Sequence, residues 1–487
     1  MAQKPVIFLL LIGMTLLNLA CQSQTTVQES PNLDLPQGEL SDIMSEGEEI
    51  ILGLNPSNQK QAAADAYSSG DYTQAVLLWE TTLEQKRNDP ETLIYLSNAR
   101  IADQPAHSIA VPIPGDAETN VAAEILRGAA QAQFQINSTG GINGKPIKLI
   151  IANDRNNPEV AQDLAQLFSQ DPKILGVIGH FSSNVSLEAA QVYQEQGLVM
   201  ISPTSSSVAL SNVGSYVFRT VSSDCVAGNA LAAYLIDKME ITQAAVLFNS
   251  ASSYSTSMRD VFRSSLEEKD GEIAVEFNFS QSNFNIVNAL AKTKQEEAQV
   301  LVFFPNSSGM NALETLDKTF LIAQMNQGEL PLLGGDSLYK PRTLQLGQNN
   351  VADMVLAVPW NTENTDSGFV ELATNLWGGK VNWRSALTYD ATMALGAAIQ
   401  QSATREGIQQ ALLDPTFIAE GASGEITFLP TGDRAGKVQL VKVKAGESSG
   451  FGYDFVPVAD FDYDLPEAPS AIKVGSNKAC WMPSRVA

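Results

Sequence analysis

Small hydroxyl side chains gather in two clusters, each directly after a short apolar run, at residues 175–178 and 198–201. An amphipathic stretch from about Ser183 to Gly197 separates the runs, and this order predicts strand, helix and strand. In an open parallel sheet, ligands bind outside the carboxyl ends of the strands. Hydroxyl groups and a helix N-terminus at that edge offer hydrogen-bond donors to a carboxylate. The clusters consist of Ser182, Ser183, Thr204, Ser205 and Ser206.

The same hydroxyl residues also have a structural interpretation. Serine and threonine are preferred helix N-caps and turn residues, and this explains any single member of a cluster better than binding does. Two clusters at paired positions of one sheet favour a binding site. We therefore predict that this edge holds a carboxylate or another small acidic group.

Residues suited to catalysis or metal binding are few. The chain has two histidines, His107 and His180, and three cysteines, Cys21, Cys225 and Cys480. His180 follows the first apolar run without a nucleophile and acid near it in sequence, so we interpret it as structural. No phosphate-binding glycine loop, His-Glu-x-x-His or Cys-x-x-Cys motif is present. We predict no enzymatic activity, no cofactor and no metal site.

Three further residues each keep two interpretations. Arg219 either binds an anion or forms a salt bridge in the cleft with an acid such as Asp224. Asp154 either caps a helix or lines the cleft. Trp360, at a predicted strand end, lines either the hinge or the cleft.

The acidic composition excludes one class of partner. The 487 residues include 54 Asp and Glu but 30 Lys and Arg, which gives a formal charge of −24. Nucleic acid would be repelled by this charge. The length allows two or three domains, and 44% hydrophobic residues are ordinary for a globular protein.

The first twenty residues have the pattern of an export signal. Lys4 precedes an apolar run at 5–17, and small or polar residues lead to Ala20 and Cys21. The sequence Leu-Ala-Cys resembles a bacterial lipobox, except that Asn18 stands where leucine is usual. The resemblance implies lipid attachment at Cys21; cleavage without lipidation is the alternative. We predict a periplasmic or cell-envelope protein anchored to the membrane, because no other stretch is long and apolar enough to span it.

Two predicted segments separate the signal from the main body. Residues 21–57 are rich in Gln, Ser, Glu and Pro and predict a flexible tether. Residues 58–105 have helical patterning that resembles a tetratricopeptide repeat, with a generic helical hairpin as the alternative. A single repeat cannot bury its apolar face, so we expect it to pack on the next domain or on a partner. The positions that carry the resemblance are Gly70, Tyr72, Ala75, Trp79 and Leu83.

From Ser108 onward, strand and helix patterns alternate for more than 300 residues. This alternation predicts parallel sheets covered by helices on both faces, in two lobes with a cleft between them. Strands are expected at 109–113, in a stretch that ends at 154, and at 175–178, 198–201, 216–221, 244–249, 272–279, 300–304, 330–333, 355–358, 424–428 and 438–443. Helices are expected in a stretch that ends at 137, in stretches that begin at 157 and 255, and at 183–197, 227–238, 285–294, 309–324, 368–376, 385–401 and 405–413.

In order, these pieces resemble the periplasmic solute-binding proteins for branched-chain amino acids, which have the type I periplasmic-binding fold. The resemblance covers roughly residues 108–444. Seven segments carry it in the expected order: GGINGKPIKLIIAND with the following Asn-Pro-Glu, GHFSSNVSLEAA, MISPTSSS, YVFRTVSSD, LLGGDSLY, ALTYDA and GEITFLPTGD.

The resemblance implies roles for five residues. An amino-acid carboxylate would be held by the hydroxyl of Ser183, the backbone of Thr204 and the hydroxyl of Ser206. Asp336 would pair with the ligand's ammonium group, and Tyr254 would close over the ligand.

Two loops depart from the family pattern. The loop PGDAETN carries Asp116 and Glu118 where an aromatic residue is common, and Pro-Asn-Ser-Ser follows Phe304. An apolar pocket would lose walls by both changes, which favours a polar ligand or one that is not an amino acid.

The implied function is capture of a small solute, an amino acid, by hinge closure, for an ABC permease and its ATPase. The alternative is a lipoprotein regulator that docks a cell-envelope protein such as a cell-wall synthase. The predicted domains are a signal peptide at 1–20, the tether at 21–57, the helical segment at 58–105, the binding domain at 106–447 and a tail at 448–487. Lobe 1 is predicted at 106–225 and 356–425, and lobe 2 at 226–355 and 426–447. The tail is expected to lie against one lobe, pinned by a disulfide between Cys225 and Cys480.

Overall fold

The computed structural model describes residues 40, 42–53, 56–115, 117–306, 308–309, 311–361, 368–459, 461 and 463, and the backbone of 471–474 and 478–481. The described residues belong to one compact unit. The predicted signal peptide, Cys21 and Asp116 lie outside the described residues. Within the described part of the chain, no helix is long and apolar enough to cross a membrane.

The first lobe is built on a six-stranded sheet that is parallel except for one edge. Strand β1 pairs antiparallel with β3, and all other neighbours run parallel. Its order is β1 (Met44–Ser45), β3 (Ile147–Asn153), β2 (His107–Ile113), β4 (Ile174–Ile178), β5 (Met200–Ser202) and β6 (Val217–Arg219).

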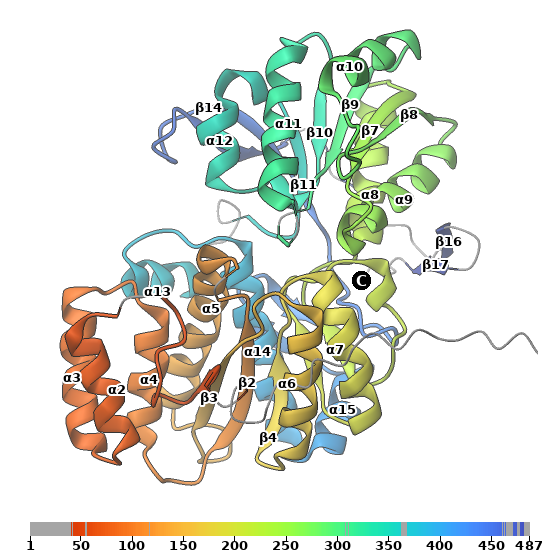
Figure 1. The fold of residues 1–487 in the computed structure, drawn as a ribbon. Coiled ribbons are helices and arrows are strands. Elements are labelled where there is room, and N and C mark those ends of the chain that lie inside the picture. Colours follow the sequence, from red (N-terminus) through yellow and green to blue (C-terminus); the bar gives the residue numbers. More distant parts are fainter. Residues whose placement is uncertain are drawn as a thin grey trace, which may run out of the picture. The chain divides into compact units, whose positions relative to one another are not determined.

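Helices cover both faces of this sheet, because successive strand residues point to opposite sides. Ile109 and Val111 pack with α5 (Thr119–Ser138) and α14 (Trp383–Gln401), whereas Ala110 packs with α6 (Pro158–Gln170) and α7 (Ser183–Gln196). Figure 1 shows α6 and α7 side by side. Helices α13 (Gly368–Trp377) and α15 (Arg405–Leu413) and the hairpin β12 (Ala419–Gly421) and β13 (Gly424–Ile426) complete this lobe.

The second lobe contains a seven-stranded sheet. Five of its strands run parallel to one another. The other two, β14 and β15, lie at one edge and pair antiparallel. The order is β15 (Tyr453–Pro457), β14 (Gln439–Ala445), β11 (Val355–Val358), β10 (Leu332–Gly334), β9 (Val300–Phe304), β7 (Gln243–Phe248) and β8 (Glu272–Asn278). Its helices are α8 (Asp224–Ala233), continued by a π-helical turn at Tyr234–Lys238, α9 (Ser253–Glu267), α10 (Ile286–Gln295), α11 (Ala312–Asn326) and α12 (Pro341–Gly347). The α/β class and two-sheet architecture predicted from the sequence are confirmed.

The N-terminal helices form an additional layer on the first lobe. They are α2 (Asn58–Ser68), α3 (Tyr72–Gln85) and α4 (Pro90–Ile101), and α4 contacts α5 and β3. Trp79 and Tyr95 of this layer belong to the same apolar core as the strands. The expectation that the segment packs on the next domain is met; its assignment to a repeat family stays a prediction.

Two predicted boundaries need correction. Strand β11 pairs with β10 and β14, so residues 356–358 belong to lobe 2 rather than lobe 1. The predicted tail contributes β15 to the sheet of lobe 2, because its backbone pairs with β14.

Two further strands of the tail, β16 (Ala471–Val474) and β17 (Lys478–Trp481), pair antiparallel, and β16 contacts α9. Cys225, at the start of α8, is disulfide-bonded and packs with Val261 of the same α9. This placement of the backbone at residue 480 supports the predicted Cys225–Cys480 pairing.

Candidate functional site

A cavity of about 470 Å³ lies at the carboxyl ends of strands from both sheets, within the range of small-molecule sites. Ser183, Thr204, Asp336 and Tyr254 all line it. These residues come from the segments after β4, β5, β10 and β7, which are distant in sequence. The structure therefore brings together four of the five predicted ligand residues.

The N-terminus of α7 faces this cavity without its usual cap. The N-cap residue Ser182 makes no capping hydrogen bond, because its hydroxyl donates to the Asn156 side-chain oxygen at 2.6 Å. The Ser183 hydroxyl accepts from the backbone N–H of Ser207 at 3.3 Å, which leaves its own proton to donate. Uncapped N–H groups and this hydroxyl are suited to an anion.

Hydroxyl groups of the second cluster form hydrogen bonds within the protein. The Thr204 hydroxyl donates to the Phe181 carbonyl at 2.7 Å, and Ser205 bonds the same carbonyl at 3.0 Å. Ser206 does not line the cavity; its hydroxyl bonds to Asp224, and its carbonyl accepts from the Asp224 N–H at 2.8 Å. The Thr204 and Ser205 hydroxyls thus hold the loop after β5 against the loop after β4.

Asp336 brings a carboxylate to the other side of the cavity, directly after β10. Burial raises the pKa of Asp336, while Arg384 and a hydrogen bond from Tyr254 lower it. Burial raises the pKa of Tyr254 well above its ordinary value, so its hydroxyl stays protonated and able to donate. Gly335 permits this arrangement, because a side chain there would overlap the Tyr254 hydroxyl.

Sequence reasoning missed Arg384 and Trp383, which also line the cavity. Helix α14 begins at Trp383, capped by the Asn382 side chain at 2.8 Å from the Arg384 N–H. We expected this helix from 385, which left both residues in a loop. An Asn followed by a helical pattern was the available signal.

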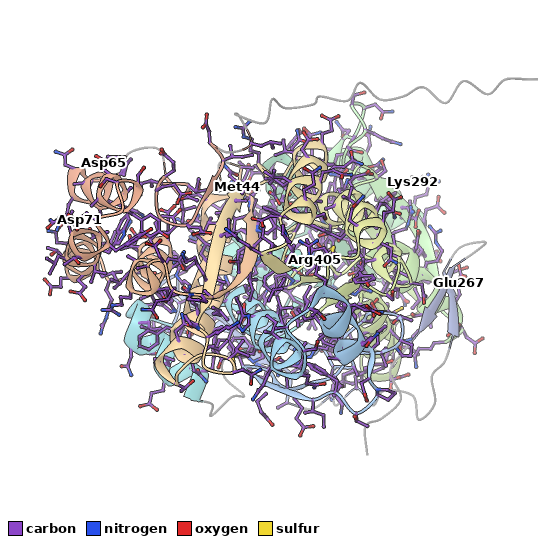
Figure 2. All side chains as sticks on the ribbon, turned by 90° about the horizontal axis from the view of Figure 1, so that it is seen from below. Met44, Asp65, Asp71, Glu267, Lys292 and Arg405 are labelled. Carbon is purple, nitrogen blue, oxygen red and sulfur yellow. The ribbon has the colours of Figure 1, made fainter. Side chains whose placement is uncertain are left out.

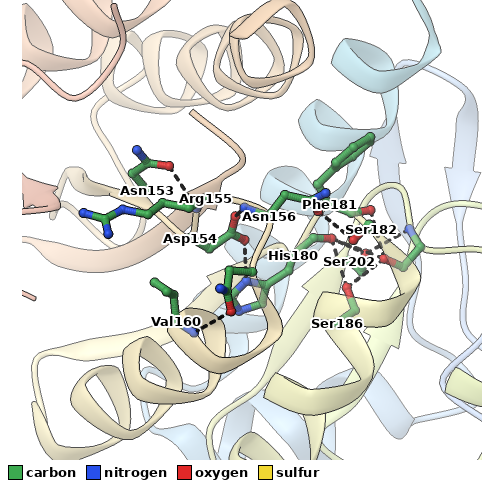
Figure 3. A network of polar contacts seen from close by, with 12 residues as sticks. Asn153, Asp154, Arg155, Asn156, Val160, His180, Phe181, Ser182, Ser186 and Ser202 are labelled. Atoms are coloured by element: carbon green, nitrogen blue, oxygen red, sulfur yellow. Dashed lines mark hydrogen bonds and ion pairs between the residues drawn. The ribbon is translucent and has the colours of Figure 1, made fainter. Parts of the chain in front are cut away.

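Two other predicted residues are structural and buried. The His180 Nδ1 lies 2.7 Å from an oxygen of Asp154, and its Nε2 lies 3.1 Å from the Tyr193 hydroxyl. Asp154 lies in the turn between β3 and α6, and Figure 3 shows its side chain directed at His180. Both residues therefore brace the loops beside the cavity.

Of the two interpretations of Arg219, the structure has the salt bridge to an aspartate, but with a different partner from the one suggested. Arg219 pairs with Asp433 at 2.6 Å instead of Asp224, because the segment after β13 runs beside β6. Its guanidinium also donates to the Ser207 carbonyl at 2.7 Å. Trp360 is buried after β11 and does not line the cavity. No group of three or more potential metal ligands occurs among the described residues.

Known proteins resemble this chain in sequence. Residues 109–448 match a family profile described as periplasmic binding protein. A Leu/Ile/Val-binding protein homolog of Brucella abortus (strain 2308) is 28% identical over 252 residues, covering 51% of this chain and 64% of that protein. An amino acid binding protein of Pseudomonas aeruginosa is 29% identical over 178 residues, covering 36% of this chain and 47% of that protein. The chain thus spans less than two thirds of either relative.

Solved structures share the fold. A leucine binding protein from Thermotoga maritima superposes with a TM-score of 0.61 at 20% identity, covering 72% of this chain and 97% of that chain. A solute binding protein from R. palustris in complex with benzoate gives 0.61 at 18% identity, covering 73% and 96%.

Proposed function

Because the chain belongs to the periplasmic binding protein family, we propose that it captures a small solute, an amino acid, outside the cytoplasmic membrane. The observation that supports this most directly is the cavity, which lies between the uncapped N-terminus of α7 and the partly buried carboxylate of Asp336. The α7 N-terminus with Ser183 would bind the carboxylate, and Asp336 would bind the ammonium group. A dipolar molecule matches both ends at once.

Transport is the proposed purpose of this binding. Asp336 and Ser183 come from different sheets, so a ligand that contacts both would stabilise a closed arrangement of the lobes. A closed, loaded protein would then present to an ABC permease with its ATPase. The relatives' names, Leu/Ile/Val-binding and amino acid binding, support this proposal.

The regulator alternative receives no comparable support. Most apolar residues of the helical layer α2–α4 are buried in the core of the first lobe, although Leu77 of α3 stays exposed. We therefore keep solute capture as the single proposed function.

Calorimetric titration of the full chain with the L-amino acids tests the proposal. We expect at least one to bind, and Asp336→Asn to weaken that binding by about 10- to 100-fold, since hydrogen bonds to charged groups contribute about 1.5–3 kcal/mol. Asp65→Asn, on the exposed side of α2 (Figure 2), is the matched control and should leave affinity unchanged. If no amino acid binds, the proposal fails.

The proposed lipid anchor has its own test. Membrane fractions of cells that express the full chain should contain it, and Cys21→Ala should release it to the soluble fraction. Equal membrane association of both forms would contradict an anchor at Cys21.

A further inference from the structure

Arg384 is a buried cation that lines the cavity, and within the described part of the chain its Nε donor has no hydrogen-bond acceptor. The residue is 4% exposed, and its guanidinium carbon lies 4.4 Å from the Trp383 ring centroid and 6.0 Å from that of Phe181. Its Nε has no hydrogen-bond partner, and no ion pair of this guanidinium occurs among the described residues. A buried charge without a partner is costly, so this side chain is prepared for an anion that arrives from outside.

The Trp383 ring lies under the guanidinium of Arg384 and favours a stacked orientation. Stacking on an aromatic face leaves the in-plane N–H groups of arginine at the edges. These edges suit the two oxygens of a carboxylate, which arginine binds in bidentate fashion. The apolar rings would at the same time contact the methylene groups of a ligand.

Among the acids near Arg384, Asp336 acts on it most strongly. Asp336, Glu124 and Glu118 act on it electrostatically from outside ion-pair distance. Glu124 already pairs with Arg127 at 2.7 Å, and Glu118 faces Lys340. When a ligand's ammonium group occupies Asp336, the positive charge of Arg384 is left without compensation.

We propose that Arg384 forms a second anion site and that the ligand is an acidic amino acid, one with a carboxylate in its side chain. This inference rests on the proposed function and narrows it. The α-carboxylate binds at the α7 N-terminus, the ammonium group binds Asp336, and the side-chain carboxylate binds Arg384. The contacts at the α7 N-terminus and Asp336 leave the positive charge of Arg384 unpaired. A ligand with a net charge of −1 supplies the carboxylate that neutralises it.

Paired ligands that differ only in this charge provide the test. The full chain is titrated at pH 7 with L-glutamate against L-glutamine, and with L-aspartate against L-asparagine. We expect at least one acid to bind about 10- to 100-fold more tightly than its amide, in keeping with a charge-assisted bidentate contact. Arg384→Gln should remove most of this preference, and Arg100→Gln, an exposed residue of α4 paired with Glu80, should retain it.

The glutamine titration separates ligand contact from an indirect effect. If Arg384 served only to keep Asp336 ionised, Arg384→Gln would weaken both members of a pair equally, and the inference would be wrong. Arg384→Lys keeps the charge without the planar fork and should show an intermediate preference, with thermal unfolding confirming that each variant folds. Tighter binding of amides or of leucine would overturn the inference yet leave solute capture intact. Binding of no amino acid would remove both.

Discussion

Two buried arginines of the first lobe have opposite surroundings. Arg219 donates to Asp433 and to the Ser205 and Ser207 carbonyls, so its charge and donors are satisfied within the protein. Arg384 lies over the Trp383 ring, with the Phe181 ring farther away, and its Nε has no acceptor among the described residues. The first arginine fixes the loop that carries Thr204, whereas the second is arranged for a ligand.

Asp224 makes stability depend on pH. Burial raises its pKa to about 7, with Asp336 adding to the rise and hydrogen bonds from Ser257 and Ser206 opposing it. The folded protein therefore holds a proton that the unfolded chain releases at lower pH. This contribution to stability is fully present below the unfolded pKa and is lost as pH rises through about 7.

We expect Asp224→Asn to narrow the difference in melting temperature between pH 6 and pH 8, because the amide does not titrate. Differential scanning calorimetry at both pH values measures it. Asp65→Asn, at an exposed aspartate, should preserve the wild-type difference. An unchanged pH dependence in Asp224→Asn would contradict the assignment to this carboxyl group.

The sequence predicted that Ser183, Thr204, Tyr254 and Asp336 would lie together, and all four line the cavity, but it did not predict how their side chains are oriented. Ser183 and Asp336 follow strand ends, and strand ends are visible as apolar runs. The orientation of a loop is not visible in the same way: Thr204 lines the cavity, whereas Ser206, two residues on, bonds to Asp224. Arg384 was missed because the predicted helix began at residue 385, two residues after the observed start of α14 at Trp383.

Helix α14 depends on close contact with α5. A side chain at Gly128 would overlap the carbonyl oxygen of Ser385, whereas one at Gly396 would meet Ile136 Cδ1 at an ordinary 3.4 Å. The small residue at 128 therefore sets how near the N-terminal turn of α14, with Arg384, approaches α5.

We expect Gly128→Ala to lower the free energy of unfolding by about 1–3 kcal/mol, the usual cost of overpacking. Gly396→Ala, in the same helix pair, should be neutral or stabilising by up to about 1 kcal/mol, because alanine favours helix more than glycine does. Denaturant unfolding compares them. Equal stability of the two variants would contradict the prediction, because it would mean that the backbone at Ser385 moves to accept a side chain at position 128.

Lys60 joins the N-terminal helices through a buried ion pair. Its ammonium lies 2.9 Å from Asp89 and 2.8 Å from Glu91, and Glu91 also accepts from the Ile51 and Leu52 N–H groups. Burial raises the pKa of Glu91, and Lys60 opposes that rise. Removing the cation would leave two acids buried together.

Lys60→Met should therefore cost about 3–5 kcal/mol of unfolding free energy at pH 7, as broken buried pairs do. Lys292→Met, on the exposed face of α10, should change it by less than about 0.5 kcal/mol. Urea unfolding monitored by circular dichroism measures both. A loss below about 1 kcal/mol at Lys60 would mean that the acids are hydrated or protonated without it.

Element types were predictable because buried parallel strands form continuous apolar runs. The sequence did not predict which lobe contains β11, because the same apolar run fits either sheet. Strand β15 was missed because its residues are only half-buried and include Asp454 and Pro457, which are uncommon in strands.

For the molecule as a whole, the disulfide links the start of lobe 2 to a distant part of the chain. With three cysteines, a Cys225–Cys480 bond leaves Cys21 available for the proposed lipid attachment. Peptide mapping of the unreduced full chain should recover a linked pair of peptides containing residues 225 and 480. Recovery of Cys480 as a free thiol would contradict this pairing.

The fluorescence of Trp383 would report whether the cavity is occupied. Its ring is 1% exposed, lies beneath the Arg384 guanidinium and borders the cavity. Indole emission responds to charges close to the ring, so neutralisation of the guanidinium by a bound anion would shift the fluorescence of this tryptophan. An unlabelled sample in a cuvette would then report occupancy through its own emission, and Trp383→Phe would leave a chain that binds without that signal.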